Sequence, residues 1–132
     1  MNILVFGNQD HPDDNLAFKV SEKLSGLANI SFQVINPNSD IPLPDNKKIY
    51  LIDTVVGIDN VTLITENDLN KILLSPRTTA HDYDLGFQLK YLTKIGKIKK
   101  VFIIGLPISG NVDYDLIHLI LRKLVAQDMQ GS

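Results

Sequence analysis

Acidic and histidine side chains that could do chemistry stand in three places in this sequence. Asp13 and Asp14 follow the first apolar run of the chain. Asp53 lies near the end of a later apolar run, and the pair His81–Asp82 stands in a polar segment before a helical pattern. Two carboxylates and an imidazole that converge from separate elements would bind a divalent metal ion, because oxygen and nitrogen ligands suit borderline metals such as nickel or zinc.

The same residues also have structural interpretations. Asp13 and Asp14 could cap the helix that follows them, because a side-chain oxygen at a helix start accepts hydrogen bonds from the unpaired N–H groups there. His81, taken alone, is more often a hydrogen-bonded loop histidine. Asp53 differs from these, since an unpaired carboxylate is costly to bury in an apolar run, and a functional role is favoured for it.

The motifs that the sequence lacks exclude several kinds of chemistry. It has no cysteine, which excludes thiolate metal ligands, cysteine nucleophiles and disulfides and fits a reducing cytosol. It has no GxSxG, GxGxxG or HExxH motif and no glycine-rich phosphate loop with a lysine. A divalent-metal site is therefore the main chemical interpretation that the residues leave.

Charge and hydropathy give no sign of a nucleic-acid or membrane partner. The 132 residues include 13 basic and 15 acidic side chains, for a net charge of −2. The basic cluster at 94–100 is interpreted as a helix end followed by a solvated turn. The first residues do not form a signal peptide, and no apolar segment approaches the roughly 18 residues that span a bilayer. We expect a soluble, cytoplasmic protein.

The elements that must position these residues follow from an alternation of short apolar runs and segments of helical period. Strands are expected at 2–6, 30–35, 49–56, 61–65 and 100–107. Helices are expected at 16–26, 66–74, 84–96 and 112–127, the second of them capped by Thr65. This alternation predicts an α/β three-layer sandwich, with a twisted, mostly parallel sheet and helices on both faces. Residues 1–130 are expected to form a single domain, with 131–132 a cloning remnant.

The order of the elements predicts where the candidate residues meet. In sheets of this kind ligands bind beyond the carboxyl ends of the strands. The acidic loop follows the first strand directly, and Asp53 stands where another strand is ending. We therefore expect both at the same edge of the sheet.

Five stretches of the sequence resemble one known family. They are, in order, "ILVFGN", "DDNLAFKVSEKL", "IYLIDTVVG", "HDYDLGFQLKYL" and "KVFIIGLP". Together they resemble the hydrogenase maturation proteases, the endopeptidases of nickel–iron hydrogenases, over roughly residues 2–125. The resemblance implies a phosphorylase/hydrolase-like α/β fold. It also implies removal of a C-terminal peptide from the hydrogenase large-subunit precursor once nickel has been inserted.

The resemblance also implies a role for each candidate residue. Asp14, Asp53 and His81 would be the catalytic residues and would contact the nickel ion, which the precursor itself supplies. The metal would polarise the scissile carbonyl or bind the attacking water. The residues implied around this group are Asp82 and Asp84, which would orient His81, and Asn8 and Asp13 in the loop beside the site.

Alternatives remain, because the surroundings of these residues depart from the family pattern. Asn15 and Leu16 stand where relatives usually have glycines, and "NPNSDIP" replaces a glycine-rich turn. One alternative is a non-catalytic relative that binds nickel or a hydrogenase subunit. Another is a phospho-receiver domain, although no lysine follows the last strand at "GLP"; a nucleotide-binding module would need a phosphate loop. We predict a monomeric peptidase of the aspartyl or metal-assisted type.

Overall fold

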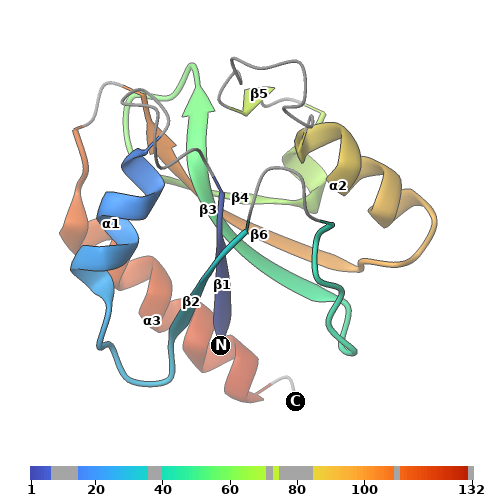
Figure 1. The fold of residues 1–132 in the computed structure, drawn as a ribbon, viewed down its shortest axis with the longest axis horizontal. Coiled ribbons are helices and arrows are strands. Elements are labelled where there is room, and N and C mark those ends of the chain that lie inside the picture. Colours follow the sequence, from blue (N-terminus) through green and yellow to red (C-terminus); the bar gives the residue numbers. More distant parts are fainter. Residues whose placement is uncertain (7–14, 36–39, 71–72, 75–84, 109–110, 131–132) are drawn as a thin grey trace.

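The computed structural model describes residues 1–6, 15–35, 40–70, 73–74, 85–108 and 111–130 (Figure 1). Within these ranges the chain forms one six-stranded sheet with helices on both faces. The strands are β1 (Asn2–Val5), β2 (Ser31–Val34), β3 (Lys48–Val56), β4 (Thr62–Thr65), β5 (Leu73–Leu74) and β6 (Lys100–Pro107). The helices are α1 (Leu16–Leu24), the short 3₁₀ helix η2 (Glu66–Asp68), α2 (Leu85–Lys94) and α3 (Tyr114–Gln130). The predicted α/β three-layer sandwich is confirmed.

The sheet is mostly parallel and has β3 at its centre. Its strand order is β2-β1-β3-β6-β4, and β5 pairs with the end of β3. The pairs β1–β2, β1–β3 and β3–β6 are parallel, whereas β4 lies antiparallel to β6 and β5 antiparallel to β3. A central parallel strand is covered on both faces, which explains the nearly continuous apolar run of β3.

Two separate cores fill the spaces on either side of the sheet. Because side chains alternate along a strand, Tyr50 and Ile52 of β3 face α1 and α3, whereas Leu51 and Val55 face α2. Figure 1 shows the same arrangement, with α1 and α3 on one side of the sheet and α2 on the other. None of the helices in the described part of the chain is long and apolar enough to cross a membrane.

The start and end of α1 follow simple backbone rules. The N-cap position belongs to Asn15, whose carbonyl oxygen accepts a hydrogen bond from the Lys19 N–H at 3.2 Å, and its side chain makes no capping bond to the described helix. Asp13 and Asp14, the residues interpreted as possible caps of this helix, both lie outside the described residues. Gly26, with φ of 94°, follows the helix as expected, since glycine adopts the left-handed region without strain.

The helix predicted over 66–74 is wrong beyond its first turn. Thr65 does begin it, and the Asp68 carboxylate accepts hydrogen bonds from the Thr65 N–H and hydroxyl at 3.2 and 3.3 Å. However, only η2 forms, and Leu73–Leu74 pair as β5 with the end of β3. A helix as short as the predicted 66–74 is only marginally stable on its own. Pairing of Leu73–Leu74 with β3 instead satisfies backbone groups of β3 that lie beyond the end of β1.

Candidate functional site

Asp53 is the one candidate site residue that lies within the described part of the chain. It stands on β3 at the level where β1 ends, because the last β1 pair is Val5 with Ile52. The chain leaves β1 through Phe6, whose N–H donates to the Ile52 carbonyl oxygen at 3.3 Å. Asp53 is therefore at the carboxyl end of β1, as predicted, although β3 itself continues to Val56.

The Asp53 carboxylate is buried and held by the backbone of the next residue. Asp53 is 1% exposed, and its Oδ1 accepts a hydrogen bond from the Thr54 N–H at 2.8 Å. Alternate residues of a strand direct their backbone groups to the same side, so Thr54 faces the side where Ile52 pairs with β1. There β1 has ended and β5 begins only opposite Val55. A backbone N–H thus orients the carboxylate at a level of β3 that neither β1 nor β5 pairs in the described part of the chain.

Aliphatic groups pack beside Asp53 on the α2 face of the sheet. Its register partner on β6 is Gly105, which has no side chain to occupy this position. A Cβ atom at Gly105 would lie 2.9 Å from Val55 Cγ2 and 3.0 Å from Ile64 Cδ1, so these two side chains already fill the space. The flank of Asp53 towards β6 and β4 is therefore closed by packed methyl groups.

The hydroxyl of Thr54 is a polar group that sequence reasoning missed. Thr54 is buried, and its Oγ1 has no hydrogen-bond partner among the described residues. Since side chains alternate, this hydroxyl lies on the face opposite Asp53. No sequence signal identifies it, because threonine is common in strands. Buried polar groups thus lie on both faces of β3 at this level.

The remaining predicted site residues lie outside the described residues. They are Asn8, Asp13, Asp14, His81, Asp82 and Asp84. Asp14 directly precedes Asn15 at the start of α1, and Asp84 directly precedes Leu85, the first residue of α2. Both helices begin near the edge of the sheet where β3 ends (Figure 1). The described residues alone contain no group of three or more His, Asp or Glu side chains that could hold a metal ion.

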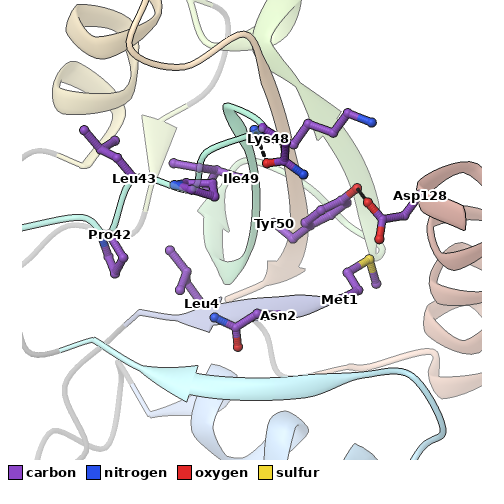
Figure 2. Close-up of a pocket in the computed structure, with 11 residues that line it drawn as sticks. Met1, Asn2, Leu4, Pro42, Leu43, Lys48, Ile49, Tyr50 and Asp128 are labelled. Carbon is purple, nitrogen blue, oxygen red and sulfur yellow. Dashed lines mark hydrogen bonds between the residues drawn. The ribbon is translucent and has the colours of Figure 1, made fainter. Parts of the chain in front are cut away.

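A hollow at the opposite edge of the sheet contains a second polar pair. The cavity has a volume of about 230 Å³ and is lined by the first residues of β1 and β3, a loop at 42–46 and Asp128 (Figure 2). The Tyr50 hydroxyl donates to Asp128 Oδ1 at 3.1 Å, and the Tyr50 ring stacks on Phe102 with centroids 5.2 Å apart. This cavity lies at the amino ends of the strands, away from Asp53, and we do not assign it to the same site.

Tyr50 gives the protein a predicted sensitivity to alkaline pH. Burial, reinforced by the Asp128 charge and hydrogen bond, raises the pKa of Tyr50 from 10.0 to about 12. Because the folded state holds this proton more tightly than the unfolded state, the stabilisation is complete below pH 10 and is lost as the pH rises towards 12. Thermal unfolding at pH 9 and 11 is expected to show a larger loss of stability for wild type than for Tyr50→Phe. Equal losses of stability in wild type and Tyr50→Phe would contradict this prediction.

Comparison with known proteins places the fold. No protein-family model matches the chain, and no curated protein matches it in sequence. Among solved structures, the hydrogenase 2 maturation peptidase from Thaumarchaeota archaeon SCGC_AB-539-E09 aligns with 94% of this chain and 98% of its own, at 21% identity and a TM-score of 0.51. The chain has the hydrogenase maturation protease fold. A hydrogenase 3 maturation protease aligns with 81% of the chain and 72% of its own length, at 19% identity and a TM-score of 0.49.

This confirms the resemblance at the level of the fold. Within that fold Asp53 lies at the carboxyl end of β1.

Proposed function

We propose that this protein is an endopeptidase that removes a C-terminal peptide from the large-subunit precursor of a nickel–iron hydrogenase. The observation that carries the proposal is the maturation-protease fold, which spans nearly the whole chain. The buried Asp53 supports it, because its carboxylate lies at the edge of the sheet where ligands bind in α/β folds of this kind.

Asp53 has the chemistry that nickel recognition requires. The bond from the Thr54 N–H orients the Asp53 carboxylate, whose oxygen atoms are hydrogen-bond acceptors. An oxygen ligand of this kind suits a borderline divalent metal. We propose Asp14 and His81 as the other two contacts, with Asp82 and Asp84 as partners that fix the orientation of the His81 ring.

The nickel ion belongs to the substrate in this proposal. The precursor brings it, and it would supply Lewis-acid polarisation of the scissile carbonyl or of a water molecule. The part of the protein is to recognise the loaded metal with its own side chains. Asp53 does this from the central strand of the sheet, and a strand supports an accurate arrangement of ligands better than a loop does.

The surroundings of Asp53 do not favour a phospho-receiver domain. A phospho-receiver needs a lysine after its last strand to contact the phosphoryl group, and none directly follows β6, which ends at Pro107. The strand β3 also continues for three residues beyond Asp53, to Val56. A non-catalytic relative that binds a hydrogenase subunit is the alternative that experiment must separate from the protease.

Nickel-dependent cleavage is the predicted result that tests the proposal. A candidate large-subunit precursor is incubated with the protein, with and without nickel, and its mass is measured. We expect loss of a C-terminal peptide only with nickel. Complex formation without cleavage would indicate the binding-only relative. Neither cleavage nor complex formation with any precursor of the same organism would overturn the proposal.

A further inference from the structure

Large apolar side chains form an exposed stripe along α2. Phe87, Tyr91 and Ile95 are 63%, 54% and 48% exposed. They recur at intervals of four residues, which places them one above the other on the same face of a helix. Ile95 continues this face beyond the last helical residue, because its N–H donates to the Tyr91 carbonyl oxygen at 3.1 Å. We call these three residues the α2 stripe.

The fold does not need the α2 stripe for its core. The opposite face of α2 buries Leu85 and Leu89 against the sheet, with Leu92 packed beside them. Single exposed apolar residues are common in soluble proteins, but an aligned row of two rings and an isoleucine is not. Aromatic side chains contribute much of the energy of protein interfaces, so the exposed parts of Phe87 and Tyr91 favour a binding role for this face.

The charges around the stripe define the partner that could cover it. Residues 85–100 contain five lysines and no aspartate or glutamate. Lys90 and Lys94 are exposed beside the stripe, and Lys97 is exposed just beyond it. Pairing this face with a second copy of itself would bring like charges together, which disfavours self-association. A surface with apolar side chains and carboxylates is the complementary occupant.

The position of α2 connects this surface to the proposed site. The helix begins at Leu85, and the sequence immediately before it contains His81, Asp82 and Asp84. The Phe87 end of the α2 stripe is therefore only a few residues along the chain from the segment that we propose contacts the substrate's nickel. We propose that the α2 stripe docks an acidic, apolar-centred surface patch of the large-subunit precursor. This inference rests on the proposed function and deepens it.

The apolar residues of the stripe and the lysines beside it contribute to binding in different ways, so their contributions can be measured separately. Half-exposed aromatic anchors supply most of the binding energy of an interface and control dissociation. Lysines at its rim mainly accelerate association and make it depend on salt. We therefore expect the stripe to set the affinity for the precursor and Lys90 and Lys94 to set the rate of encounter.

The test measures binding and cleavage of the nickel-loaded precursor separately. The variant Tyr91→Ser/Ile95→Ser is expected to weaken binding at least about tenfold and to raise KM with kcat unchanged. Leu119→Ser is the matched control, because Leu119 is 46% exposed on α3, on the opposite face of the sheet. It is expected to bind as wild type does. Thermal unfolding checks that both variants are folded.

A second variant tests the basic rim. Lys90→Glu/Lys94→Glu is expected to slow association several-fold at low salt, and the difference from wild type is expected to shrink as salt is added. Calorimetry gives the affinities and stopped-flow mixing gives the rates. Association that is unchanged at low salt would overturn the assignment of an acidic partner.

The outcomes distinguish this inference from the proposed function. Cleavage by wild type together with unchanged binding by Tyr91→Ser/Ile95→Ser would overturn the docking surface and leave the protease standing. If wild type binds the precursor without cutting it, the proposed function fails, and weaker binding by the double variant still supports the docking surface. No binding by wild type would overturn both.

Discussion

Asp53→Asn is expected to reduce cleavage of the nickel-loaded precursor by more than about 100-fold. Mutation of a residue that only orients a metal ligand costs about 10–100-fold, and loss of a ligand should cost more. The substitution keeps the shape of the side chain, and its amide oxygen can still accept the Thr54 N–H. The protein should therefore remain folded, with wild-type binding of nickel-free precursor. Mass spectrometry of the product measures the rate.

The control for this prediction is the same substitution at the other edge of the sheet. Asp128→Asn also removes one carboxylate that accepts a hydrogen bond, from Tyr50, but far from the carboxyl ends of the strands. It is expected to cleave at the wild-type rate. Asp53→Ala is a poorer test, because it leaves the buried Thr54 N–H without this acceptor, at a cost of about 1–3 kcal/mol in stability. Near-normal cleavage by Asp53→Asn would exclude a catalytic role for this residue.

The sheet could be predicted because its signals are local. β3 shows the continuous apolar run of a central parallel strand, and it was predicted at 49–56 and observed at Lys48–Val56. A functional role is favoured for Asp53 because a carboxylate in such a run is costly to bury. Its side chain is buried and hydrogen-bonded in the structure. One physical argument thus identified both the strand and the residue.

The features that could not be predicted depend on distant partners. β5 forms because β3 extends beyond the end of β1, so that Val55 and Val56 require another strand to pair with. Nothing in the local pattern at 66–74 reveals this. Tyr50 meets Asp128 across 78 residues of sequence. Periodicity shows which face of a helix is buried, as at Leu89, but it does not show what the other face binds. The roles of Asp14 and His81 stay predictions.

Gly105→Ala is expected to destabilise the protein by about 1–3 kcal/mol, although the substitution adds only one methyl group. The added Cβ would lie 2.9 Å from Val55 Cγ2 and 3.0 Å from Ile64 Cδ1, with the Thr62 carbonyl oxygen at 3.3 Å. Val55 is β-branched on a central strand and can move little, since its χ1 angle has few alternatives. Urea unfolding at constant pH measures the change in the free energy of unfolding.

A second substitution shows whether crowding is the cause. Val55→Ala removes the methyl group that approaches most closely, so the variant Gly105→Ala/Val55→Ala should be more stable than the sum of the two single effects predicts. Coupling between residues in contact amounts to about 0.5–3 kcal/mol. Additive effects would show that Gly105 is required for a reason other than packing. Relief by Val55→Ala would instead establish that tight packing closes the flank of Asp53 towards β6.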